Sequence, residues 1–302
     1  MARVVVFAEY GEPEVLRVVE VDDPHPGGDE LRIRVKAAGV QPVDARYRRG
    51  DFSQYKPADF PARLGNEAAG VVDAIGRDVT GFAIGDEVIV FVDSIAYADT
   101  IVAPAANAAH KPAAMPWPEA GVLTASGQTA DTALDALGVT TGDRVLIHAA
   151  AGGVGSYATQ LAIARGATVI GTASERNHAY LTELGAIPVT YGPGLANRVR
   201  ELAPDGITAA VDCIGGEAND VSVQLLGTPD RAITLVDWQH AGGVRRVGTD
   251  RSATRLSGLC SLYEKGALTV PIWKQFTLDQ APLAHHEIET GHVRGKIALV
   301  VS

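Results

Sequence analysis

The sequence has 302 residues, of which 46% are hydrophobic and 21% are charged, a composition typical of a globular protein. Its formal net charge is −10, and because an acidic surface repels phosphate backbones we expect no nucleic-acid partner. No apolar run reaches the roughly 18 residues needed to span a bilayer, and Glu9 interrupts the first apolar run too early for a signal peptide. We therefore expect a cytoplasmic protein with no membrane partner.

The first 120 or so residues have the pattern of β-structure. Short runs rich in Val and Ile alternate with turns that contain Gly and Pro. Polar and apolar residues alternate along 31–36, which predicts a strand with one wet and one buried face. The predicted strands are Ala2–Ala8, Val15–Val21, Leu31–Ala38, Ala69–Ile75, Glu87–Val92 and Thr100–Pro104.

From about residue 118 helical and strand patterns alternate. Strands that alternate with helices form βαβ units, in which the strands run parallel. The predicted strands are Arg144–His148, Thr168–Thr172, Pro188–Tyr191, Ala209–Cys213 and Ala232–Val236. The predicted helices are Glu119–Leu137, Ser156–Arg165, Arg176–Leu184, Leu195–Leu202, Glu217–Leu226 and Arg251–Lys265. This pattern predicts a doubly wound parallel sheet inserted into a β-rich domain, to which a last strand, Lys296–Val301, returns.

A glycine-rich turn follows the strand 144–148 and opens the next helix. Ala150, Gly152 and Gly155 occupy the three positions of the dinucleotide-binding fingerprint. Such a turn lets the backbone approach a pyrophosphate, which then lies on free N–H groups at the helix N-terminus. The expected pyrophosphate-binding residues are Ala151, Gly152, Gly153, Val154 and Gly155.

The choice of nicotinamide cofactor depends on the end of the next strand. An NAD site has an Asp or Glu there, which accepts a hydrogen bond from the ribose 2′-hydroxyl. Here the strand ends at the neutral Ala173, and Ser174 and Arg176 follow with a hydroxyl and a cation suited to a 2′-phosphate. The sequence therefore favours NADPH. The competing interpretation is an NAD site that uses Glu175, 20 residues after Gly155.

With these motifs in place, the chain resembles the zinc-independent quinone oxidoreductase (zeta-crystallin-like) branch of the medium-chain dehydrogenase/reductase superfamily. The resemblance rests on segments that keep their order and spacing along nearly the whole chain: 38–44, 64–72, 85–88, 126–130, 152–155, 171–174 and 295–299. It implies an α/β protein with a GroES-like β-barrel domain (1–122 and 266–302), an inserted Rossmann domain (123–265), a cleft between them and a homodimer.

Two residues argue against zinc. Alcohol dehydrogenases of the superfamily carry a Cys and a His where this chain has Gln41 and Asn66, and neither replacement is a usual zinc ligand. With two cysteines in all, Cys213 and Cys260, the four-cysteine structural site cannot form either.

Three histidines, His285, His286 and His292, are spaced unlike any standard metal motif. We expect them to be solvated imidazoles on a surface helix. Cys213 is expected to be a buried strand residue rather than a nucleophile.

Further candidate residues come from position and from the resemblance. The Gln41 amide is a candidate donor to a substrate oxygen or to the nicotinamide ribose. Tyr47 lies one place after the tyrosine of related quinone reductases, so it is either a proton donor or a packing residue. Thr129 matches a threonine beside the nicotinamide, and Tyr191 a tyrosine near the adenosine end. The remaining cofactor candidates follow later parallel strands, where doubly wound sheets bind ligands: Ile214, Gly215, Val236 and Trp238.

These features predict an NADPH-dependent reductase of a small-molecule quinone or conjugated enone. Without a metal to hold an alkoxide, alcohol oxidation would lose its main electrostatic help, whereas reduction of a conjugated C=C bond needs mainly orientation and donors to an enolate oxygen. The alternative is an NADPH-binding structural or regulatory protein with little turnover.

Overall fold

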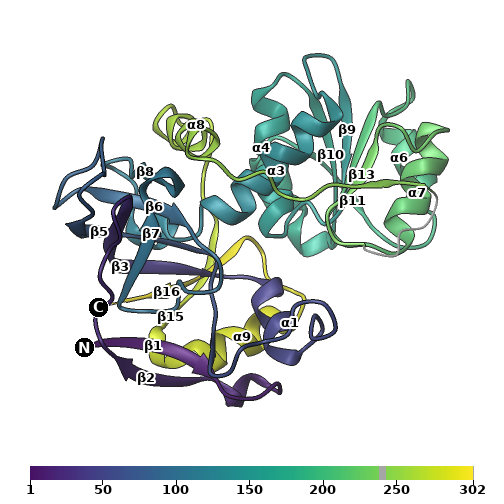
Figure 1. Ribbon diagram of the computed structural model, residues 1–302. Helices are drawn as coiled ribbons and strands as arrows, with labels where there is room; N and C mark the ends of the chain where they lie inside the picture. The colour runs from purple at the N-terminus through teal and green to yellow at the C-terminus, as the bar shows by residue number, and fades with distance from the viewer. Residues whose placement is uncertain (238–242, 302) are drawn as a thin grey trace. The chain divides into compact units, whose positions relative to one another are not determined.

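The computed structural model describes residues 1–237 and 243–301. The chain separates into two compact units, each built from segments distant in the sequence (Figure 1). The first unit comprises Met1–Ala125, Arg251–Glu264 and Val270–Ser302, and the second comprises Ser126–Asp250 and Lys265–Thr269.

The first unit is built on two sheets. One sheet has seven strands in the order β15-β16-β3-β5-β6-β8, with β7 paired to β3, and the other has three strands in the order β2-β1-β4. The strands are β1 (Ala2–Phe7), β2 (Arg17–Val21), β3 (Glu30–Val40), β4 (Ala62–Arg63), β5 (Glu67–Ile75), β6 (Glu87–Phe91), β7 (Thr100–Pro104), β8 (Ala108–His110), β15 (Ile272–Thr277) and β16 (Lys296–Val300).

The central strand of the first unit is β3, and it has the predicted alternation. Leu31, Ile33 and Val35 are buried in the core, whereas Arg34 between them is exposed. β16 pairs antiparallel with β3 and places Leu299 opposite Ala38. The C-terminal segment therefore returns to the first unit, as the sequence predicts.

The sequence predicted α8 within 251–265 and a helix at His285 and His286, which is α9, but it gave no prediction of α1. α1 and α9 pack against each other, and both start with Pro within their first two positions, where the missing N–H costs nothing. The helices are α1 (Pro42–Arg49), α2 (Trp117–Ala120), α8 (Ala253–Glu264) and α9 (Ala281–Glu289), with 3-10 turns η1 (Pro13–Val15), η2 (Ala105–Asn107) and η4 (Leu278–Gln280).

The second unit contains a six-stranded parallel sheet in the order β11-β10-β9-β12-β13-β14. Strand order reverses at β9, the point at which doubly wound sheets bind ligands beyond the carboxyl ends of their strands. The strands are β9 (Arg144–Ile147), β10 (Thr168–Ala173), β11 (Ile187–Thr190), β12 (Ala209–Asp212), β13 (Ala232–Thr234) and β14 (Arg245–Arg246). The helices are α3 (Thr124–Leu137), α4 (Gly153–Ala164), α5 (His178–Glu183), α6 (Leu195–Leu202) and α7 (Glu217–Leu226), with the 3-10 turn η3 (Glu175–Asn177).

Two of the helices differ most from the prediction in where they begin. The single helix expected over Glu119–Leu137 is divided into α2 and α3, because α2 ends at Ala120 before Gly121. α4 begins at Gly153 rather than Ser156, so two glycines lie in its first turn.

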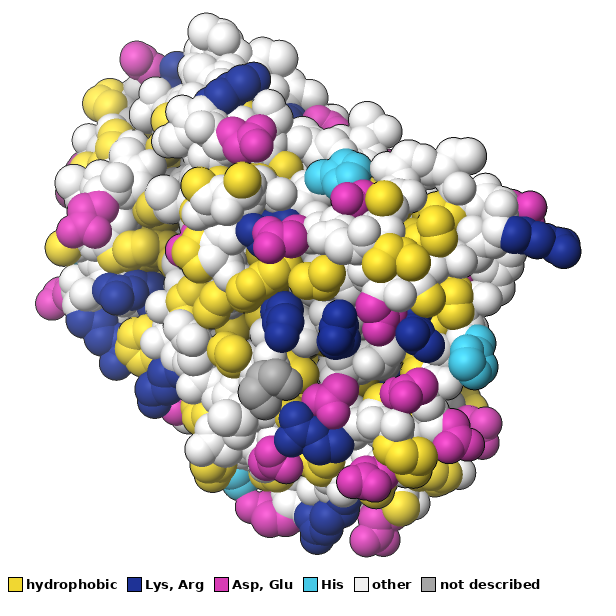
Figure 2. Space-filling view, turned by 90° about the vertical axis from the view of Figure 1, so that its left-hand side faces the viewer, with side chains coloured by type: hydrophobic (Ala, Val, Ile, Leu, Met, Phe, Trp, Pro, Cys, Tyr) yellow, Lys and Arg dark blue, Asp and Glu magenta, His cyan; other side chains and the backbone are white. Residues whose placement is uncertain are grey.

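The surface carries charges of both signs. Figure 2 shows acidic and basic side chains interspersed with apolar ones over one face of the molecule. Among the described residues, no helix combines the length and apolar character needed to cross a membrane.

Candidate functional site

The glycine-rich turn between β9 and α4 has the geometry of an anion-binding helix start. Gly152 precedes the helix in an extended conformation, and none of the described side chains caps the helix there. The first N–H groups of an α-helix have no partner within the helix, and they lie at the positive end of its dipole. Gly153 and Val154 are partly exposed, so a ligand can approach the start of the helix, whereas the backbone N–H of Gly152 donates to the Ala149 carbonyl at 2.9 Å.

Close packing explains why this turn needs glycine. A Cβ atom on Gly155 would come within 2.3 Å of the carbonyl oxygen of Ala149. Ala149 itself has a φ of 52°, a left-handed conformation that costs about 1–3 kcal/mol in a non-glycine residue. Its backbone N–H donates to the Thr172 hydroxyl at 3.0 Å, which fixes the turn against β10. The turn is therefore a preformed cradle.

The two candidate partners of the cofactor ribose, Glu175 and Arg176, follow the end of β10. Ala173, its last residue, is buried and neutral. Glu175 and Arg176 both lie beyond the strand in η3, and both are exposed. Because Ala173 pairs with Thr190 in parallel register, Ser174 and Tyr191 follow neighbouring strands at the same edge.

A second group of candidates meets at the ends of β12 and β13. Asp212 accepts hydrogen bonds from the backbone N–H groups of Ile214 and Gly215, both at 2.8 Å, and from the Thr234 hydroxyl at 2.7 Å. These contacts curl the chain after β12, with Gly215 at a φ of 85°. A Cβ atom on Gly215 would lie 3.6 Å from Cγ2 of Val236, so the two predicted residues are neighbours.

The side chains of Ile214 and Val236 remain open to a ligand, with 66% and 37% of their surface exposed. Trp238, predicted to join them, lies outside the described residues. Thr129 lies on α3, partly buried, with its hydroxyl 2.7 Å from that of Thr249.

In the first unit, Gln41 precedes α1 and is partly buried. Its amide nitrogen donates to Oε1 of Glu67 at 3.0 Å. Glu67 is fully buried and also accepts from Nζ of Lys296 at 3.0 Å and from the backbone N–H of Ala125 at 2.7 Å. These contacts hold the Gln41 amide in one orientation.

Asn66 is likewise engaged within the protein, because its amide nitrogen donates to Oδ1 of Asp44 at 2.8 Å. The two positions that hold zinc ligands in related alcohol dehydrogenases therefore carry amides with protein partners. Within 1–237 and 243–301, no group of three or more His, Cys, Asp or Glu side chains is arranged to hold a metal ion.

Tyr47 has the contacts of a packing residue. Its ring is partly buried and packs edge-on against Phe7, with ring centroids 5.8 Å apart. The ammonium of Lys56 lies 5.4 Å from the centre of the same ring. Burial raises the pKa of the Tyr47 hydroxyl above its ordinary value, which disfavours loss of its proton. Its role as a proton donor stays a prediction.

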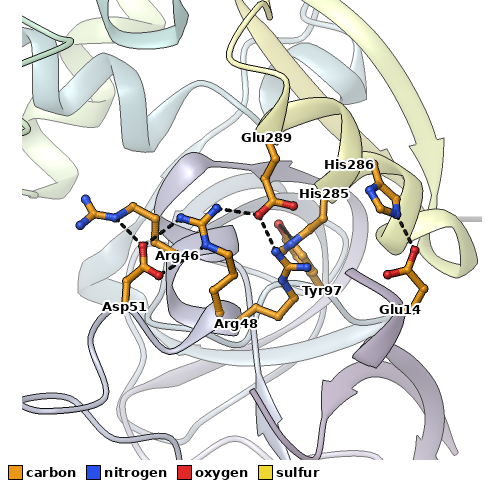
Figure 3. Close-up of polar contacts among 9 residues, drawn as sticks. Glu14, Arg46, Arg48, Asp51, Tyr97, His285, His286 and Glu289 are labelled. Carbon is orange, nitrogen blue, oxygen red and sulfur yellow. Dashed lines mark hydrogen bonds and ion pairs between the residues drawn. The ribbon is translucent and has the colours of Figure 1, made fainter. Parts of the chain in front are cut away.

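The expectation of three solvated histidines was wrong for His285. Its side chain is fully buried, packed edge-on against Tyr97 at 5.9 Å (Figure 3). Burial, followed by the charge of Arg48, lowers its pKa to about 3. His286 is exposed and lies 2.6 Å from Oε1 of Glu14.

The helical period of α9 explains the different environments of these two neighbours. Its inward face follows the i, i+3, i+4 spacing through Ala281, Ala284 and His285. That spacing was the signal for burial, and it was available in the sequence.

Two family models match parts of the chain. The model of the alcohol dehydrogenase GroES-like domain matches residues 27–113, and that of the zinc-binding dehydrogenase matches residues 153–236. A quinone oxidoreductase of Pseudomonas aeruginosa is 30% identical over 99% of this chain and 100% of its own length. The chain belongs to the quinone oxidoreductase branch of the medium-chain dehydrogenase/reductase superfamily.

Two solved structures bear on the cofactor of this branch. A mycobacterial protein, Rv1454c, determined in complex with NADPH, is 30% identical with a TM-score of 0.87 over 99% of this chain and 100% of its own. An NAD-dependent alcohol dehydrogenase is 31% identical with a TM-score of 0.91 over 99% of this chain and 100% of its own. This quinone oxidoreductase homologue is therefore similar to proteins described with either nicotinamide cofactor.

Proposed function

We propose that this protein is an NADPH-dependent reductase that transfers hydride to a quinone or an α,β-unsaturated carbonyl substrate without zinc. The observation that carries the proposal is the end of β10, where a neutral, buried Ala173 is followed by the exposed guanidinium of Arg176. The side chain of a buried alanine offers no acceptor to a ribose hydroxyl, whereas a guanidinium matches the geometry of a phosphate group.

The proposed cofactor site uses the described geometry as follows. The turn 151–155 would bind the pyrophosphate through the N–H groups at the start of α4 that have no partner within the helix. Ser174, Arg176 and Tyr191 would surround the 2′-phosphate end, and Thr129, Ile214, Gly215 and Val236 would contact the remainder, with Trp238 proposed on sequence alone. The NADPH in the mycobacterial relative supports this choice. Because one relative is NAD-dependent, Glu175 of this chain remains the competing partner of the ribose. The experiment below distinguishes Arg176 from Glu175.

The chemistry asks little of the protein beyond orientation and charge stabilisation. Bound NADPH would supply a hydride. When the electron pair enters the electrophilic carbon of a conjugated carbonyl compound, negative charge develops on the carbonyl oxygen and a proton completes the reduction. Donors aimed at that oxygen stabilise the charge.

Gln41 is the proposed donor in the first unit. An amide nitrogen carries two N–H groups. In Gln41, one of them is directed at Glu67, and this bond fixes the plane of the amide. The second N–H is the one we assign to the substrate oxygen.

The decisive experiment is NADPH consumption with a panel of quinones and conjugated enones, followed by comparison with NADH. We expect oxidation of NADPH by at least one of these acceptors. Arg176→Ala should weaken NADPH binding and leave NADH binding unchanged, and Glu175→Ala is the matched control from the same exposed turn. If the wild type instead prefers NADH and Glu175→Ala loses that preference, the cofactor of this protein is NAD(H) and not NADPH. Saturable NADPH binding without oxidation would favour a structural or regulatory role.

The functional division into 1–122, 123–265 and 266–302 and the homodimer are also proposals. Sedimentation velocity of the full chain tests the homodimer directly, since a monomer at micromolar concentration would contradict it.

A further inference from the structure

A buried series of polar side chains crosses the first unit. Asp44 on α1, Tyr97 between β6 and β7, and His285 on α9 are each at most 2% exposed. The Tyr97 hydroxyl donates to Oδ2 of Asp44 at 2.9 Å and lies 3.5 Å from Nε2 of His285. Three segments far apart in the sequence therefore form one hydrogen-bonded series.

One end of the series reaches Gln41, the residue assigned to the substrate oxygen. Oδ2 of Asp44 also accepts the backbone N–H of Gln41 at 2.9 Å, and Oδ1 accepts the Asn66 amide at 2.8 Å. An ionised carboxylate accepts such bonds about twice as strongly as a neutral group does. The charge of Asp44 consequently affects how firmly the backbone of Gln41 is held, while Glu67 holds its side-chain amide.

The surroundings of Asp44 place its titration in the physiological range. Burial raises its pKa to about 7, and the charge of Glu67 acts in the same direction. Hydrogen bonds from Tyr97 and Gln41 and the charge of Lys296 oppose this rise. Both charge states of Asp44 are therefore accessible near neutral pH.

The other end of the series lies beside Arg48 (Figure 3). Nδ1 of His285 and Nε and Nη1 of Arg48 are buried without a hydrogen-bond partner among the described residues. Nη2 of Arg48 donates to Oε1 of Glu289 at 2.6 Å, and Glu289 is 18% exposed. Buried polar atoms of this kind are usually satisfied by water. A water bound at these atoms would link the series to solvent at the partly exposed Glu289.

His285 is suited to pass a proton without holding one. Burial and the charges of Arg48 and His286 disfavour its cationic form. A neutral imidazole carries a proton on one ring nitrogen and a lone pair on the other, so it can change which nitrogen is protonated.

We propose that Asp44 exchanges its proton with solvent through Tyr97 and His285, and that its charge positions Gln41 for reaction. A proton from water binds Nδ1 of His285, and the proton on Nε2 passes to the Tyr97 hydroxyl oxygen. The proton that Tyr97 held passes to Oδ2 of Asp44. One proton thus enters at His285 and one arrives at Asp44, while His285 and Tyr97 stay neutral. The hydrogen bonds between His285 and Tyr97 and between Tyr97 and Asp44 both reverse direction. Asp44 is a positioning residue in this scheme, and only this positioning role rests on the proposed function.

Infrared difference titration of the full chain without cofactor tests the proton path. As pH rises, we expect the C=O band of a protonated carboxyl group to disappear with a midpoint near pH 7 in wild type. This band should be missing at every pH in Asp44→Asn. After a pH jump, wild type should lose this band in a fast phase. His285→Gln should lose the fast phase, because an amide cannot exchange its donor and acceptor atoms as imidazole does. His286→Gln, the exposed neighbour on the same helix, is the control and should keep it.

A titrating band that persists in Asp44→Asn, or a fast phase that persists in His285→Gln, would overturn the path. Should His285→Gln fail to fold, Tyr97→Phe removes the central hydroxyl and tests the same loss.

The pH dependence of turnover tests the positioning role. With NADPH and a quinone, kcat of wild type should rise through the midpoint found by infrared titration. Asp44→Asn should lose this rise and keep the KM for NADPH. A rise that persists in Asp44→Asn would overturn the role of Asp44 alone. Titration of Asp44 in a protein that oxidises no NADPH would instead overturn the proposed function and leave the proton path standing.

Discussion

The buried ion pair between Lys296 and Glu67 gives the sharpest stability prediction. Lys296→Met removes a cation that is 3% exposed and lies 3.0 Å from a fully buried carboxylate. Removing one partner of such a pair leaves an uncompensated buried charge and costs about 3–5 kcal/mol. In Lys296→Met, Glu67 keeps the hydrogen bonds from the Gln41 amide and from the backbone N–H of Ala125.

At about 2–4 °C per kcal/mol for a domain of this size, Tm should fall by roughly 6–20 °C. Scanning calorimetry of the full chain measures this change. Lys274→Met is the matched control, because it breaks an exposed 2.7 Å pair with Glu287 that is worth about 0–1 kcal/mol.

The double variant Glu67→Gln/Lys296→Met separates charge from packing. Replacing the carboxylate with a neutral amide removes the orphaned charge, so the double variant should regain part of the lost Tm. A Tm of Lys296→Met equal to that of the control would refute the reasoning, and so would a double variant less stable than Lys296→Met.

Three further predictions concern the cofactor turn, Tyr47 and the buried histidine. Gly155→Ala should abolish NADPH binding, measured by fluorescence titration, because the added methyl group would displace the Ala149 carbonyl. Tyr47→Phe should retain turnover if Tyr47 only packs, and a large loss of kcat would restore it as a proton donor. His285 has a folded pKa of about 3 against an ordinary 6.5, so the folded state binds fewer protons than the unfolded state between these values. Its contribution to stability is therefore present above pH 6.5 and lost as pH falls towards 3, and urea titrations should show a weaker loss in His285→Gln than in wild type.

The parts of the fold that local patterns determine were predictable from sequence. α6 and α7 have the predicted limits, because Gly194 precedes one and Gly216 and Gly227 flank the other, all with positive φ. The parallel sheet followed from alternating strand and helix patterns, and the fingerprint turn lies where the glycines placed it.

The buried series was beyond prediction, since Asp44, Tyr97 and His285 are separated by 53 and 188 positions and meet only through tertiary packing. Their burial depends on which face of each element turns inward. The roles of the predicted site residues stay predictions, because a role depends on the bound partners as well as on the residue and its place.

The pairing of β16 with β3 has a consequence for biosynthesis. The first unit cannot complete its larger sheet until residues 296–300 have been made, although β1 to β8 are synthesised long before. Until then the edge of β3 that will pair with β16 is open, and an open strand edge is a template for association with other chains. The second unit, whose strands and helices are nearly contiguous, can form on the ribosome while the first waits for its final strand. Early termination near the C-terminus should therefore yield aggregation rather than a merely shortened enzyme.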